Sequence, residues 1–166
     1  MNAKQLSVVA LSASLFIVSN VCGMSQAAAN RALTNLELKK GAQYKLKQIA
    51  NKKTIDANMF VEAMVLYNYI SAELKKIRTA LSPKLSAKRK RKIINKAKRA
   101  DENAIAVFGN IYSAWSGAGM PGVVNVGAIK GKISAKFRKY VDAAVLEVEE
   151  WRKELQEEAK PEREKE

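Results

Sequence analysis

The sequence predicts an all-α protein: an antiparallel bundle of about four helices with one glycine-rich loop, preceded by a signal peptide. Three stretches repeat apolar residues at intervals of three and four, the spacing of one face of an α-helix. No stretch sustains the alternation of apolar and polar residues that is typical of strands. Amphipathic helices bury their apolar faces against one another, so we expect these stretches to pack together.

Residues 1–27 are typical of a secretory signal peptide. After Lys4 the segment is uncharged, and residues 8–18 form an almost unbroken apolar run. This run is shorter than the roughly 20 residues that usually span a bilayer. The Ser-Gln-Ala sequence that ends at Ala27 is a small-x-small cleavage site, so we expect cleavage there and a periplasmic or secreted mature protein. An uncleaved N-terminal segment that anchors the chain is the alternative.

One helical domain is expected over residues 28–156. Its first helix is expected over residues 28–51, where the apolar stripe is weak and Gly41 costs about 1 kcal/mol relative to alanine. A second helix follows, which Thr54 or Asp56 can cap. The stripe of this second helix consists of Met59, Ala63, Leu66, Ile70, Leu74, Ile77 and Leu81.

A third helix is expected to begin at Pro83, with Ser82 as its N-cap. A fourth ends before Pro161, and residues 157–166 are expected to be a solvated, charged tail. The stripe of the third helix is Ile93, Ala97, Ala100, Ala104, Phe108, Ile111 and Trp115, and that of the fourth is Ile133, Phe137, Tyr140, Ala144, Val148, Trp151 and Leu155. We expect the stripes to meet in one core that buries Ile70, Leu74, Phe108, Ile111, Phe137 and Tyr140 together.

The loop between the last two helices is expected over residues 116–131, which contain five glycines and a proline. Gly117, Gly119 and Gly122 match the spacing of the dinucleotide-binding fingerprint. That fingerprint requires a preceding strand, whereas here a helical stripe precedes it and Pro121 lies within it. We therefore reject a nucleotide site in this loop.

Positive charge is concentrated in the first part of the expected domain. Residues 28–99 hold 19 Lys or Arg and 4 Asp or Glu, a net charge of +15, whereas residues 141–166 carry −5. Such a field attracts anionic lipid headgroups, an anionic envelope polymer, nucleic acid or an acidic protein. Export argues against nucleic acid as the physiological partner.

The densest cluster places nine cations and no acid among sixteen residues, from position 84 to position 99. On a helical wheel all but Lys90 occupy one half of the circumference, opposite Ala87, Ile93, Ile94 and Ala97. The residues expected to bind an anionic partner are Lys84, Lys88, Arg89, Arg91, Lys92, Lys96, Lys98 and Arg99. The competing interpretation is a solvated face that the acids of the last helix partly neutralise.

A second uncharged stretch covers residues 104–129. One interpretation is a hairpin that inserts into a lipid interface after the basic face has docked. The residues that would insert are Phe108, Ile111, Trp115, Met120, Val123 and Val124. The interpretation that we favour is a buried helix followed by a packed loop, because asparagines and glycines lower the hydrophobicity of the stretch.

Catalysis and cofactor binding have few candidate residues. The sequence has no histidine, and its one cysteine, Cys22, lies in the expected signal peptide. This removes the usual metal ligands and the commonest general base, so we expect no cofactor and no metal. A glycan hydrolase that uses carboxylates is the remaining enzymatic alternative, with Glu62, Glu73, Asp101 and Glu102 as the acids to consider. We expect instead a non-enzymatic exported protein that binds an anionic surface or an acidic partner.

Overall fold

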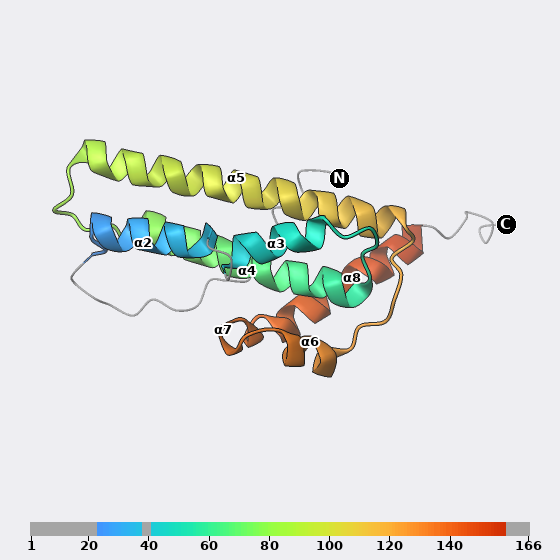
Figure 1. Cartoon of the computed structure of the whole chain (residues 1–166). Helices are drawn as coiled ribbons and strands as arrows, with labels where there is room; N and C mark the ends of the chain where they lie inside the picture. Colours follow the sequence, from blue (N-terminus) through green and yellow to red (C-terminus); the bar gives the residue numbers. More distant parts are fainter. Residues whose placement is uncertain (1–22, 38–40, 159–166) are drawn as a thin grey trace.

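The computed structural model of the 166-residue chain describes residues 23–37 and 41–158. These residues are mostly helical and form no strand, which confirms the all-α prediction. Most of the expected signal peptide and most of the expected tail lie outside the described residues. The helices are α2 (Gln26–Glu37), α3 (Ala42–Ala50), α4 (Ala57–Thr79), α5 (Ala87–Gly117), α6 (Val126–Lys132), α7 (Ala135–Arg138) and α8 (Val141–Glu158), as Figure 1 shows.

Helix α4 is the centre of the fold, with α3, α5 and α8 packed against it (Figure 1). It begins where the sequence predicts, because the carboxylate of Asp56 accepts a hydrogen bond of 2.8 Å from the amide of Met59. Its stripe residues Ile70 and Leu74 are fully buried. Because several helices cover the first half of α4, additional residues outside the stripe are buried there, among them Phe60, Val61, Met64, Val65 and Tyr67.

Helix α5 begins at Ala87, so the predicted start at Pro83 is wrong. Ser86 caps it by accepting a hydrogen bond of 3.4 Å from the amide of Arg89. The hydroxyl of Ser82 instead accepts a bond of 3.3 Å from the amide of Lys84 in the connection between α4 and α5. All seven stripe residues predicted for this helix are buried.

The single helix expected over residues 28–51 is two helices, α2 and α3, and the second begins directly after Gly41. Gly41 is the N-cap residue of α3 and has an extended backbone. A Cβ atom there would lie 2.3 Å from the carbonyl oxygen of Leu36 and 2.5 Å from that of Asn35. This close approach of two backbone segments leaves no room for a side chain, so the glycine marks a turn and not a weak point within one helix.

The C-terminal third of the chain contains more helices than the apolar stripe predicts. Part of the expected loop is helix α6, which Asn125 caps by accepting a bond of 2.9 Å from the amide of Ala128. The expected single last helix is α7 and α8, separated from α6 and from each other by short turns. Ser134 is the N-cap residue of α7 and has an extended backbone. The apolar face is kept across these turns, since Ile133, Phe137, Ala144 and Val148 are buried.

An aromatic cluster joins α4, α5 and α8 at the C-terminal end of α5. The ring of Phe60 stacks on that of Trp115 at a centroid distance of 4.2 Å, and Trp151 of α8 lies 6.1 Å from Phe60. The loop after α5 closes over this end, where Gly119 and Gly122 have positive φ angles of 77° and 94°. The residues that we expected to share the core do so, with Tyr140 only partly buried.

The start of α2 lies at the opposite end of the bundle, beside the connection between α4 and α5. Met24 forms an isolated parallel β-bridge with Leu81. The amide of Met24 donates to the carbonyl of Ala80, and its own carbonyl accepts a bond of 2.9 Å from the amide of Ser82. This end therefore combines the first turn of α2, the last turn of α4 and the first turns of α5.

Candidate anionic docking surface

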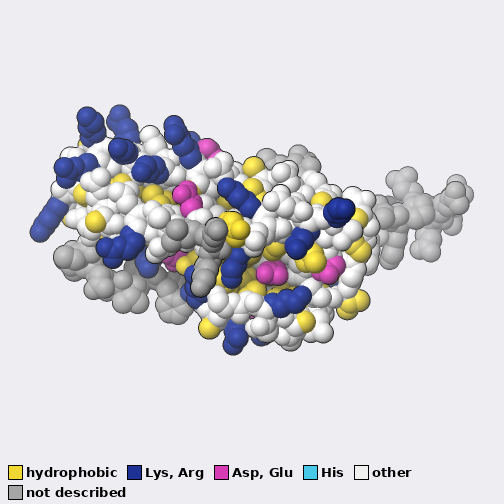
Figure 2. Space-filling view, in the orientation of Figure 1, with side chains coloured by type: hydrophobic (Ala, Val, Ile, Leu, Met, Phe, Trp, Pro, Cys, Tyr) yellow, Lys and Arg dark blue, Asp and Glu magenta, His cyan; other side chains and the backbone are white. Residues whose placement is uncertain are grey.

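The structure places the predicted cations on the exposed side of the first half of α5 and in the connection before it. We call this set the basic surface. All of its members are exposed: Lys84, Lys88, Arg89, Arg91, Lys92, Lys96, Lys98 and Arg99. Figure 2 shows Lys and Arg side chains gathered over the end of the molecule where α5 begins.

A narrow buried stripe orients this helix. Ile93 and Ala97 are 2% and 0% exposed, and Ala100 is also buried, so these three residues fix which side of α5 faces the core. The wheel placed Ile94 on the buried half, whereas it is 37% exposed and lies among the cations. Lys90, which the wheel excluded from the basic face, bends toward the connection and donates to the carbonyl of Pro83 at 3.5 Å.

The end of α4 adds cations that sequence reasoning missed. Lys75 and Lys76 are exposed in the last turns of α4, which run beside the start of α5. Arg78, from the same turns, is paired with Asp101 of α5 at 3.2 Å. The shortness of the connection could have indicated this. Only seven residues, 80–86, join α4 to α5, and such a short connection makes two helices antiparallel neighbours.

The acids of α8 lie at a different part of the molecule. Helix α8 packs on α4 and α6, and its ring contact with α5 is between Trp151 and Tyr112, at 5.6 Å. Tyr112 follows Arg99 by thirteen positions, which is roughly 20 Å along a helix axis. Trp151 thus meets α5 beyond its basic half, whereas Glu147, earlier in α8, acts on Tyr67 as Asp101 does. Within the described part of the chain, no carboxylate of α8 forms an ion pair with a cation of the basic surface.

Few negative charges of the described residues lie close enough to neutralise the cations of the basic surface. Its one ion pair among the described residues joins Lys98 to Glu102 at 3.9 Å, with both side chains more than half exposed. The first turn of α5 has no acidic residue, although a helix N-terminus carries partial positive charge. The cations therefore repel one another, and the partial positive charge at the N-terminus of α5 repels them as well.

The helical half of the stretch over residues 104–129 buries its apolar stripe in the core, whereas most of the loop that follows is exposed. Phe108, Ile111 and Trp115 are buried, Met120 and Val124 are half-buried, and Val123 is 82% exposed. The indole of Trp115 donates to the carbonyl of Pro121 at 3.3 Å. Insertion of this stretch into lipid would have to take its aromatic residues out of the bundle.

The loop in this stretch is also tied to the last helix. Arg152 of α8 donates to the carbonyl of Met120 at 2.8 Å and to that of Gly122 at 2.5 Å. None of the helices in residues 23–37 and 41–158 is long and apolar enough to cross a membrane. The membrane-insertion hypothesis thus stays a prediction, with Val123 as its most exposed residue.

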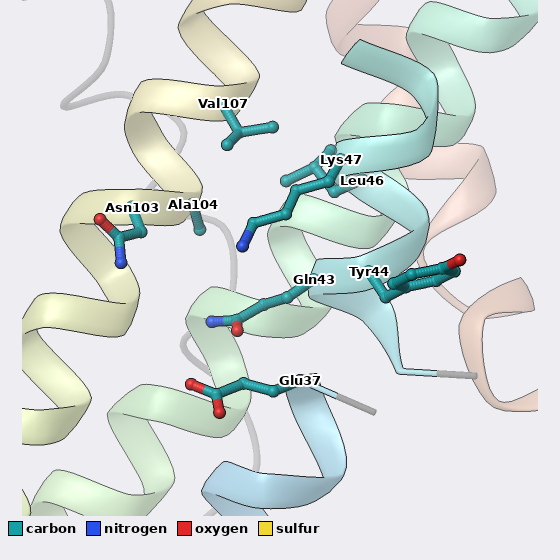
Figure 3. A pocket seen from close by; sticks show the side chains of 8 residues that line it. All are labelled: Glu37, Gln43, Tyr44, Leu46, Lys47, Asn103, Ala104 and Val107. Carbon is teal, nitrogen blue, oxygen red and sulfur yellow. The ribbon is translucent and has the colours of Figure 1, made fainter. Parts of the chain in front are cut away.

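A pocket of about 330 Å³ lies apart from the basic surface, between the end of α2, α3 and the middle of α5 (Figure 3). Lys47 and Gln43 point into it and the ring of Tyr44 points away, while Glu37 lies at its lower edge. The amide nitrogen of Gln43 donates to the carbonyl of Ala100 at 3.5 Å. Its remaining lining residues are Leu46, Asn103, Ala104 and Val107.

The carboxylates considered for catalysis do not form a common site in the described structure. Asp101 pairs with Arg78 and Glu102 with Lys98, both as charge partners. Burial raises the pKa of Glu62 on α4, an effect that Lys132 and Lys45 oppose. No group of three or more His, Cys, Asp or Glu side chains that could hold a metal ion occurs among the described residues. No protein-family model, curated protein or solved structure matches this chain.

Proposed function

We propose that this protein is an exported, non-enzymatic helical protein that binds an anionic envelope surface or an acidic protein through the basic surface. The supporting observation is that the cations on the first half of α5 are exposed and, among the described residues, form no ion pair with an acid of α8. In this proposal the N-terminal signal segment directs export, and the bundle positions the docking helix.

The energetics of the cluster favour a binding role. Like charges three or four residues apart on a helix oppose folding by about 0.2–0.5 kcal/mol for each pair. Lys88, Lys92 and Lys96 are spaced by four, so the first half of α5 contains several such pairs. An anionic partner would remove this repulsion and release counterions, which makes binding favourable and sensitive to salt. The exposed Ile94 adds an apolar contact beside the cations.

The test is binding of the full chain to vesicles that contain about one third anionic lipid, compared with neutral vesicles. We expect binding to anionic vesicles only, and a steep loss of binding as salt increases. Reversal of Arg89, Lys92, Lys96 and Arg99 to Glu should lower binding by at least about 100-fold and leave the helical circular dichroism spectrum unchanged.

A matched control carries the same change in net charge elsewhere. Lys52, Lys53, Arg138 and Lys153 are exposed residues outside the basic surface, and their reversal to Glu should lower vesicle binding much less. Equal effects of the two quadruple variants would contradict a localised docking surface. Capture of an acidic protein from the envelope, with no vesicle binding, would identify the partner as a protein.

The alternative of membrane insertion makes a different prediction for the same assay. Insertion gains most of its free energy from apolar burial, so it should persist at high salt. Binding that persists at high salt and is lost on Val123→Asp would favour insertion of residues 104–129 over electrostatic docking.

A further inference from the structure

Residues just before the expected cleavage point are integral to the fold. Met24 bridges to Leu81, its carbonyl accepts a hydrogen bond of 2.9 Å from Ser82, and its amide donates to Ala80. Its side chain packs against the core. The chain is thus already part of the domain four residues before Ala28.

Cleavage after Ala27 would remove these contacts and the start of α2. The hydroxyl of Ser25 accepts a bond of 3.2 Å from the amide of Ala28, and its carbonyl accepts one of 3.0 Å from the amide of Ala29. The first bond satisfies an amide of the first helical turn that has no partner within the helix, and the second is the first backbone hydrogen bond of the helix itself. A mature chain that begins at Ala28 would lack this cap and the bridge to the α4–α5 connection.

A second cleavage site lies four residues earlier. Gly23 is the smallest residue for the position before the cut, and Val21 occupies the position two residues before Gly23. The apolar run ends at residue 18, so Gly23 lies at most roughly 18 Å beyond it in an extended chain, against roughly 32 Å for Ala27. A peptidase that acts at the membrane surface reaches the nearer bond more readily.

We propose that the signal segment is removed between Gly23 and Met24, and that the mature protein begins at Met24. In this hydrolysis water adds to the carbonyl carbon of Gly23 and the peptide C–N bond breaks. The released segment ends in the carboxylate of Gly23, and Met24 gains a free ammonium group. This inference rests on the export proposed above, and it is independent of anionic docking.

The new terminus fits its position in the structure. The nitrogen of Met24 donates to the carbonyl of Ala80, the C-cap residue of α4, so an ammonium group there keeps the bond. A helix C-terminus carries partial negative charge and favours a cation. The group also adds positive charge to the end of the bundle that holds Lys84.

The experiment is to express the full chain with its own N-terminus in a bacterium that has a secretory signal peptidase, and to measure the intact mass of the exported protein. We expect the mass of residues 24–166. The mass of residues 28–166 would overturn the inference. Uncleaved protein retained inside the cell would overturn export, and with it this inference, whatever the vesicle assay shows.

Two variants distinguish the sites in the same assay. Val21→Arg changes a residue that the mature chain lacks, and it should cause uncleaved precursor to accumulate at least tenfold. Ala27→Leu alters an exposed position in the first turn of α2, and it should leave the cleavage point and the amount of precursor unchanged. Accumulation with Ala27→Leu but not with Val21→Arg would place the cut after Ala27 and overturn the inference.

Discussion

Arg78 and Asp101 form an ion pair at 3.2 Å that joins the last turn of α4 to α5. Their side chains are 32% and 17% exposed, so the pair is partly shielded from water. No acidic residue lies between Glu73 and Asp101 in the sequence. The first carboxylate after the cation cluster is thus engaged by a neighbouring helix, and the pair marks where the basic half of α5 ends.

Asp101→Asn is expected to lower the free energy of unfolding by about 1 kcal/mol, because it leaves Arg78 without its charge partner. Chemical denaturation at two salt concentrations measures this loss. Glu102→Gln is the control, since its pair with Lys98 is long and exposed, and it should change stability by less than about 0.5 kcal/mol. Equal effects would show that partial burial does not strengthen the Arg78 pair.

The apolar stripe of α5 could be read from the sequence because one buried face dominates this helix. All seven stripe residues of α5 are buried, including the small Ala97 and Ala104. The helix ends were less predictable. Ser82-Pro83 and Ser86-Ala87 are both plausible starts by local chemistry, and the sequence does not show that Ser82 must pair with Met24.

The exposure of the cations of the basic surface was predictable, but their electrostatic surroundings were not. The wheel placed Lys92 and Lys96 on a polar face, and both are exposed. Whether the acids of α8 lie beside them depends on tertiary packing. The contact between Trp151 and Tyr112 sets that position, and helical periodicity does not determine which part of a neighbouring helix an aromatic residue meets.

Lys92→Gln is expected to stabilise the isolated protein, because Lys92 lies four residues from both Lys88 and Lys96. With Arg89, three residues before Lys92, these make three repulsive pairs, and their removal should raise the free energy of unfolding by about 0.6–1.5 kcal/mol at low salt, a gain that added salt should reduce. Lys153→Gln is the matched control with the opposite sign, since Lys153 lies four residues from Glu149 and Glu157. Denaturation curves at low and high salt measure both, and destabilisation by Lys92→Gln would contradict the repulsion.

Glu147 is expected to make stability depend on pH. Burial, and then the nearby Glu150, raise the pKa of Glu147 in the folded protein, and its Oε1 atom is buried without a hydrogen-bond partner in the described structure. A raised carboxyl pKa means that the folded state favours the protonated form. The contribution of Glu147 is therefore fully present below its unfolded pKa and is lost as pH rises through its folded pKa.

Glu147→Gln should consequently remove the loss of stability that Glu147 causes as pH rises. Relative to the unmodified protein, the variant should gain free energy of unfolding as pH rises from below the ordinary carboxyl pKa to neutral pH. Glu149→Gln, at an exposed position of the same helix, is the control and should show a smaller change. Thermal unfolding across this pH range measures the difference, and a variant whose relative stability falls with pH would show that ionised Glu147 has a stabilising partner.

Gly41 and Gly109 should respond oppositely to substitution by alanine, although the sequence pattern predicts that each lies inside a helix. A Cβ atom at Gly41 would lie within 2.5 Å of two backbone carbonyl oxygens, so the turn between α2 and α3 would have to shift. Gly41→Ala should lower the free energy of unfolding by about 1–3 kcal/mol.

Gly109 lies inside α5 with nothing within 4 Å of the Cβ position, so alanine there replaces only the conformational freedom of glycine. Gly109→Ala should therefore raise the free energy of unfolding by about 0.5–1 kcal/mol. Denaturation of the two single variants tests the pair. If Gly41→Ala were also stabilising, residues 28–51 could form the continuous helix that the sequence pattern predicts, and the break between α2 and α3 would need another cause.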